Sequence, residues 1–165
     1  MLRTILISMT VLLGGCVTES VKLKGKGGTS WYKVEQAISG DLILVNGVGK
    51  VKYIGVDAPG KSLTGKTTES FYEESRAKNR ALVEGKFVRL EFDKKEENQR
   101  GQLLAYVFVQ KDYWSQIFVN GEMLRTGMAR YEESTINTKY QSRLLHLESR
   151  ARAKRTGIWS LPQSK

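Results

Sequence analysis

Two β-rich runs joined by Asn46-Gly47 constrain the fold of this chain more than any other feature. The first run is DLILV, residues 41–45, and the second is KVKYIGVD, residues 50–57. An Asn-Gly pair between such runs favours the tight turn of a β-hairpin, because both residues tolerate a positive φ. The sequence therefore predicts an antiparallel hairpin near the start of the folded part.

The rest of the chain supplies three more strand patterns and three helix patterns. Further strands are predicted at residues 31–37, 86–94 and 102–110, and helices at residues 69–85, 114–127 and 135–156. The buried stripe of the last helix is predicted to hold Tyr140, Leu144, Leu147 and Ala151. Five strands, with one helix after the third and two more after the fifth, indicate an α+β fold that is mainly β. We expect a five-stranded OB-type barrel with about three helices.

The length of 165 residues allows one ordinary domain. Residues 1–15 contain Arg3 as their only charge and the apolar run ILISMTVLLGG, which has the length of a signal-peptide core and is short for a transmembrane helix. Residues 16–30 are small, polar and glycine-rich, as in a flexible tether. We therefore expect a signal peptide, a tether, a domain over residues 31–160 and a tail over residues 161–165.

The single cysteine, Cys16, follows the signal-like run directly and cannot form an internal disulfide. The sequence around it resembles the lipobox of bacterial lipoproteins, in which the signal is cleaved before a cysteine that then receives lipid. The alternative is an incidental cysteine in an ordinary signal peptide. We expect an exported protein that is anchored to the bacterial cell envelope through lipid on Cys16. Val17 resembles the pattern of lipoproteins sent to the outer membrane, where the host has two membranes.

The net charge of +10 suits a polyanionic partner such as nucleic acid, an acidic envelope polymer or lipid headgroups. It suits general solubility equally well. His146 is the only histidine, so we expect no histidine-based zinc site. The GKGG segment of the tether lacks the flanking strand and helix of a phosphate-binding loop, so we also expect no nucleotide cofactor.

Several motifs together resemble the staphylococcal nuclease (thermonuclease) family over residues 31–159. In order they are GDLILV, VKYIGVDAPG, VRLEFD, LLAYVFV, VNGEMLRTGMARY and a basic helix that closes with GIW. The resemblance implies hydrolysis of DNA and RNA phosphodiester bonds with calcium. Asp41, after Gly40, and Asp57, before the Ala-Pro turn, match the family's two metal ligands, and hard oxygen ligands suit Ca²⁺. The alternative is that both aspartates only cap turns.

Three other positions depart from the pattern of that family. The family has a glutamate after the turn proline, an arginine five residues before the second metal aspartate and an arginine before the LAY strand. This chain has Gly60, Lys52 and Gln102 there. A positioned general base contributes about 10²–10⁴-fold, and one preorganised charge about 10²–10³-fold. The sequence therefore predicts a degenerate catalytic site.

Groups elsewhere in the chain could replace the missing ones. The candidates are Glu69, Glu73, Glu74 and Arg100. The simpler interpretation is that the glutamates form a solvated helix face and that Arg100 is an ordinary loop cation.

The family's base-stacking tyrosines fall near residues 131–133, where this chain has Tyr131, Glu132 and Glu133. Two carboxylates would repel an anionic nucleotide, and Tyr131 is interpreted as a core residue. We therefore predict a silent domain that binds a partner through the basic residues of its last helix. These residues are Arg143, Arg150, Arg152, Lys154 and Arg155.

Two alternatives stay open. One is an active calcium-dependent surface nuclease with a rearranged site. The other is an envelope lipoprotein whose fold supports protein contacts and whose positive charge faces anionic headgroups.

Overall fold

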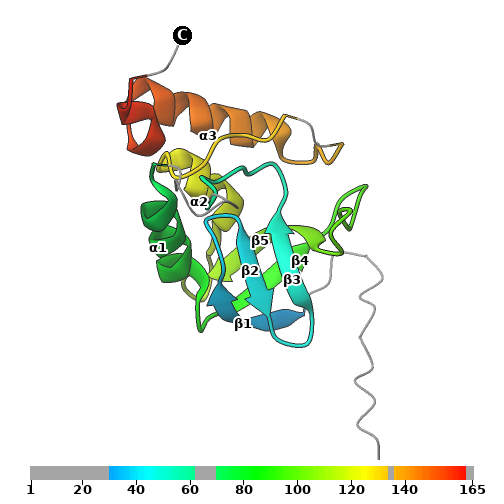
Figure 1. Cartoon of the computed structure of the whole chain (residues 1–165). Helices are drawn as coiled ribbons and strands as arrows, with labels where there is room; N and C mark the ends of the chain where they lie inside the picture. The colour runs from blue at the N-terminus through cyan, green and yellow to red at the C-terminus, as the bar shows by residue number, and fades with distance from the viewer. Residues whose placement is uncertain (1–29, 62–69, 134–135, 163–165) are drawn as a thin grey trace, which may run out of the picture.

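The structure is a computed structural model that describes residues 30–61, 70–133 and 136–162 (Figure 1). The predicted signal peptide, Cys16, almost all of the tether and Glu69 lie outside the described residues. The elements are β1 Trp31–Ala37, β2 Leu42–Val45, β3 Gly49–Tyr53, α1 Tyr72–Val83, β4 Phe87–Glu91, β5 Leu103–Gln110, β6 Gln116–Phe118, α2 Val119–Arg125, α3 Gln141–Ala153 and the one-turn 3₁₀ helix η1 Gly157–Ser160. Within the described part, none of the helices combines the length and the apolar character needed to cross a bilayer.

Five strands close into a barrel. The sheet runs in the order β3-β2-β1-β4-β5-β6, and β3 also pairs with β5 in parallel, with Val51 opposite Leu103. β6 extends β5 as the second strand of a hairpin. Figure 1 shows α1 beside the barrel and α2 between the barrel and α3. The fold confirms the predicted five-stranded OB-type barrel with three helices.

In β2 and β3 buried residues alternate with more exposed ones, as expected when one face of a strand is turned to the core. In β1 the buried residues Val34 and Ala37 are three positions apart, because the register with β2 shifts between Val34 and Gln36. β4 alternates up to Leu90, and the next residue, Glu91, is buried as well. β5 differs, since its residues from Ala105 to Val109 are all buried. Asn120 of α2 links the end of β3 to β5 by hydrogen bonds. Its amide nitrogen donates to Ile54 O at 2.9 Å, and its amide oxygen accepts from Val107 N at 2.8 Å.

All three predicted helices begin later than the sequence pattern indicated, the first of them, α1, at Tyr72. The segment predicted as a helix over residues 114–127 starts with β6, because Phe118 pairs with Phe108 of β5 and the two rings stack 5.0 Å apart. The helix predicted over residues 135–156 begins at Gln141, as α3. The preceding residues are held against the loop after β4, where Lys139 N donates to Asp93 Oδ2 at 3.0 Å. Leu144 and Ala151 are buried, as predicted.

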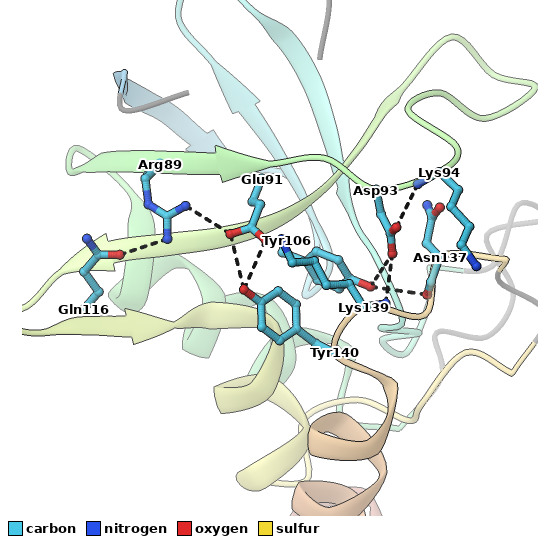
Figure 2. A network of polar contacts seen from close by, with 9 residues as sticks. All are labelled: Arg89, Glu91, Asp93, Lys94, Tyr106, Gln116, Asn137, Lys139 and Tyr140. Atoms are coloured by element: carbon cyan, nitrogen blue, oxygen red, sulfur yellow. Dashed lines mark hydrogen bonds and ion pairs between the residues drawn. The ribbon is translucent and has the colours of Figure 1, made fainter. Parts of the chain in front are cut away.

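A polar network around Glu91 ties that preceding segment to β4 (Figure 2). Glu91 is only 8% exposed, and it accepts hydrogen bonds from Arg89 at 3.2 Å and from the Tyr140 hydroxyl at 3.1 Å. Lys139 forms an ion pair with the same carboxylate. Burial opposes the ionised form of Glu91, but the hydrogen bonds from Lys139, Arg89 and Tyr140 outweigh it and hold the pKa of Glu91 below its usual value.

We expect Glu91→Gln to lower the free energy of unfolding at pH 7 by about 1–3 kcal/mol, since charge-assisted hydrogen bonds are lost. Because the folded pKa lies below the unfolded one, ionised Glu91 stabilises the fold above about pH 4.3. That contribution disappears as the pH falls through the folded pKa. Urea unfolding at pH 6 and pH 3 should therefore show a smaller acid-induced loss for the variant than for the wild type. Glu35→Gln, at an exposed carboxylate of β1, is the control, and equal losses in all three proteins would contradict the assignment.

Candidate functional site

A cleft of about 540 Å³ opens where the β1–β2 turn, the residues after β3 and the loop between β4 and β5 meet. It is lined by Ser39, Asp41, Leu42, Lys52, Asp57, Lys95, Asn98, Gln99, Arg100, Gln102 and Glu132. Four of the five site positions taken from the resemblance therefore lie together. Gly60 is described but is not among the lining residues.

The β1–β2 turn is fixed by α1. A Cβ on Gly40 would lie 1.9 Å from Ser75 Oγ and 2.7 Å from Ala58 Cβ, so only glycine allows the turn to pack this closely. Asn79, which is fully buried on α1, donates from its amide nitrogen to Ser39 O at 2.7 Å. The sequence pattern did not identify Asn79, because an asparagine on a helix is usually exposed. Together these contacts fix Ser39 and Gly40, and thereby the position of Asp41, which follows them in the chain.

The carboxylate of Asp41 is buried and has internal partners on both oxygens. Oδ1 accepts from the Ser39 hydroxyl at 2.7 Å, and Oδ2 accepts from Ala58 N at 2.9 Å. The Lys52 ammonium forms an ion pair with Oδ2. An ammonium group of this chain therefore neutralises the carboxylate that would have to bind a metal.

Asp57 reaches the cleft from the other side. It is exposed, and its backbone forms a two-residue bridge with Arg130, with N–O distances of 2.9 and 2.8 Å. The bridge joins the turn after β3 to the segment that carries Glu132, and Glu132 N donates to Gly55 O at 3.4 Å in the same pairing of the two segments.

The loop between β4 and β5 contributes residues that the sequence reasoning passed over. Asn98 Oδ1 accepts from the backbone N–H groups of Arg100 and Gln102, at 2.9 and 3.1 Å, and its amide nitrogen donates to Gln102 Oε1 at 2.9 Å. Asn137 clamps the same loop through both backbone groups of Lys95, at 2.8 and 2.7 Å. An asparagine shortly before a glycine is a turn signal that could have drawn attention to Asn98.

The charges of the cleft balance. Its described lining contains the carboxylates Asp41, Asp57 and Glu132 and the cations Lys52, Lys95 and Arg100. The positive charge of the chain is therefore not concentrated in this cleft. A surface that binds a polyanion is expected to carry an excess of cations.

Tyr131 is buried in the core, as predicted. Burial raises the pKa of its hydroxyl, and Glu133 and Glu132 raise it further. Glu132 lines both the cleft and a neighbouring hollow of about 250 Å³. In the described segment, the position next to Tyr131 thus presents a carboxylate to the cleft.

Of the described residues that could replace the missing catalytic groups, Arg100 lies in the cleft and Glu73 and Glu74 do not. Arg100 lies on a loop, as predicted, and it also lines the cleft. Glu73 and Glu74 are exposed on α1 and do not belong to the described lining, and Glu73 lies 4.0 Å from Arg76.

The residues present do not fit the calcium ion that the resemblance implies. Within the described part of the chain, no group of three or more His, Cys, Asp or Glu side chains is arranged to hold a metal ion. Asp41 is in addition engaged by the Lys52 ammonium. Calcium takes six to eight oxygen ligands, with waters and carbonyl oxygens among them, so the main obstacle is the Lys52 ammonium, which competes with a metal for the Asp41 carboxylate.

The predicted basic surface of α3 divides into two groups. Arg152 pairs with Glu148 at 3.3 Å and lies 4.0 Å over the Trp159 ring, so it holds η1 against the helix. Arg155 follows the helix end with a φ of 50°. The other three residues, Arg143, Arg150 and Lys154, line hollows between α3 and α2.

Comparison with known proteins decides the family. A model of staphylococcal nuclease homologues matches residues 50–161. The thermonuclease of Staphylococcus hyicus is 31% identical over 151 residues, which cover 87% of this chain and 86% of that protein. The chain belongs to the staphylococcal nuclease family. Endonuclease YncB of Bacillus subtilis is 33% identical over 135 residues, covering 77% of this chain and 60% of that protein.

Membership in the staphylococcal nuclease family confirms the resemblance and the barrel. It also makes the cleft the counterpart of the family's active site. Asp41 and Asp57, which match the family's metal ligands, line it together with Lys52 and Gln102. The catalytic capacity of that cleft depends on the groups that this chain places there.

Proposed function

We propose that this chain is a catalytically silent member of the staphylococcal nuclease family that acts as a binding module at the bacterial cell envelope. The observation that carries the proposal is the ion pair between Lys52 and Asp41. It replaces a metal–carboxylate contact by an internal cation–carboxylate contact.

The chemistry of phosphodiester hydrolysis supports the same conclusion. Water must be oriented or deprotonated, and cations must stabilise the charge of the transition state. Gly60 has no side chain that could act as a base. Gln102 is a neutral amide whose oxygen already accepts from Asn98. The separate losses need not add, but each one is large.

An active nuclease with a rearranged site is the second candidate. The observation in its favour is that Arg100 and Glu132 lie in the same cleft as the two aspartates. Arg100 would supply a cation and Glu132 a base. The balanced charge of the cleft opposes this candidate, because a phosphodiester substrate is an anion.

Calcium binding tests the proposed loss of the metal site. We expect the full-length chain to have the same thermal unfolding midpoint in millimolar CaCl₂ as in an equal concentration of MgCl₂. A thermonuclease of the family, measured beside it, should gain stability, since a ligand that binds only the folded state stabilises it. A saturable rise specific to calcium that Asp41→Asn abolishes would contradict the proposal.

The envelope location rests on Cys16 and the apolar run before it. Lipid on Cys16 would hold the domain at a membrane, and in a host with two membranes we place it at the outer one. A radiolabelled fatty acid fed to the expressing cells should label the wild type and leave Cys16→Ser unlabelled. Equal labelling of the two proteins would rule out lipid on Cys16 as the anchor.

A further inference from the structure

The seam between α2 and α3 carries an excess of cations around two hollows. The two helices pack side by side (Figure 1). Two neighbouring hollows, of about 300 and 290 Å³, follow the seam, and Arg125 at the end of α2 lines both. We call this surface the α2–α3 seam, and its cations are Lys111, Arg125, Arg143, Arg150 and Lys154.

The spacing along α3 makes the seam continuous. Arg143, Leu147, Arg150 and Lys154 follow one another at intervals of four, three and four residues. These intervals place their side chains on one face of a helix. Eleven residues at a rise of 1.5 Å per residue extend over about 16 Å. The Arg143 guanidinium lies 4.9 Å over the Phe118 ring, which fixes the cation at one end of the row.

The seam has an excess of positive charge that the cleft does not have. Glu122 is the one carboxylate among the described residues that line the two hollows. Its oxygens already accept two hydrogen bonds from Arg125, both at 2.7 Å, and Lys78 lies 3.3 Å away. Five cations thus line the seam with one carboxylate, and because Arg125 is engaged by that carboxylate, Lys111, Arg143, Arg150 and Lys154 carry the excess of positive charge.

An aromatic pair stands at the edge of the seam. Tyr113 and Trp114 are 82% and 90% exposed at the tip of the β5–β6 hairpin, between Lys111 and Ser115, which both line the first hollow. The tip is ordered by Asp112, whose carboxylate accepts from Trp114 N at 3.0 Å and from Ser115 N at 2.9 Å. Two large rings are therefore exposed to water on the hairpin that brings Lys111 and Ser115 to the first hollow.

We propose that the α2–α3 seam binds single-stranded nucleic acid, with backbone phosphates along its cations and a base stacked on Trp114. A cationic groove beside an exposed aromatic ring is the combination by which proteins hold single strands without reading their sequence. The concave shape favours an extended polyanion over a flat layer of headgroups. This inference deepens the proposed function by naming its partner and the surface that holds it, and it does not depend on the chemistry of the cleft.

The test measures binding of the full-length chain to a fluorescein-labelled oligothymidylate in the presence of a chelator. Fluorescence anisotropy should show that Arg150→Glu/Lys154→Glu weakens binding at least about 10-fold. Trp114→Ala should weaken it about 5- to 100-fold, as expected for one stacked base. The slope of log K against log salt should be about −2.8 if the four cations that are not engaged by Glu122 each neutralise one phosphate.

The matched control is Lys33→Glu/Lys50→Glu, which makes the same charge change at two exposed lysines of β1 and β3. We expect it to weaken binding less than about 2-fold. Circular dichroism of each variant shows whether it is folded, and Trp114→Ala changes an exposed side chain, so it keeps the test valid if the charge reversal unfolds the protein.

Three results would overturn the inference: no binding of the oligonucleotide at low salt, equal weakening by the seam and control variants, or seam-dependent binding to phosphatidylglycerol vesicles without binding to the oligonucleotide. Failure of the proposed function is seen separately. If the same samples cleave the oligonucleotide when calcium is added, the cleft is active, but the binding measured in chelator still reports on the seam.

Discussion

Replacing Gly127 by alanine is expected to lower the free energy of unfolding by about 3–5 kcal/mol. Gly127 has a φ of 66°, and a Cβ there would lie 2.1 Å from the backbone oxygen of Thr156. Gly157 lies opposite Gly127, and a Cβ added at Gly157 would lie 2.1 Å from Gly127 O. Because backbone lies on both sides and Ile158 N donates to Gly127 O at 2.9 Å, relief requires α3 and η1 to move away from α2.

Gly47→Ala is the matched control for that variant. Gly47 has a φ of 69°, and a Cβ there would meet nothing within 4 Å. It should therefore show only the cost of the left-handed backbone, about 1–2 kcal/mol. Urea unfolding of both variants separates the backbone term from the collision. If the two glycines cost the same, the tight crossing between residues 127 and 157 is not present in solution.

Lys52→Met is expected to destabilise the protein by about 2–3 kcal/mol. The change leaves the buried carboxylate of Asp41 without its cation, and breaking a fully buried pair costs about 3–5 kcal/mol. We expect less here because the Lys52 side chain is 22% exposed. Chemical unfolding at pH 7 measures the loss, and Lys50→Met, at an exposed lysine of the same strand, should change the stability by less than about 0.5 kcal/mol.

The double variant Asp41→Asn/Lys52→Met tests whether the loss comes from the pair. An amide in place of the carboxylate removes the unpaired charge, so the double variant should be more stable than the sum of the single changes predicts. If the stability losses of the two single variants simply add in the double variant, Lys52 and Asp41 do not form the ion pair in solution. The Asp41 carboxylate would then be available to bind a metal ion.

Local patterns were sufficient for the barrel. The hairpin predicted at Asn46-Gly47 forms with Val45 opposite Gly49, and Gly85 follows the end of α1 as expected. β6 was missed because a three-residue strand has too few positions to show alternation. It exists because β5 offers it a partner and because the Phe118 ring packs on Phe108.

The candidate site was predictable only in part, for a physical reason. Motifs identify positions, so they placed Asp41, Asp57 and the three departures. They carry no information on which side chains meet, and the contact between Lys52 and Asp41 depends on how two strands and a turn are held. The clamps Asn79 and Asn137 were missed for the same reason, since their buried amides bond to backbone far away in the sequence.

A cleavage assay distinguishes a catalytically silent domain from an active nuclease. The full-length chain would be incubated with single-stranded DNA and with RNA in calcium, beside a chelator blank and a thermonuclease of the family. We predict no product above the blank, because Gly60 and Gln102 supply neither base nor cation and Lys52 is engaged with Asp41. Calcium-dependent cleavage within a few orders of magnitude of the thermonuclease would contradict this prediction, and variants of Arg100 and Glu132 would then test whether these residues replace the missing groups.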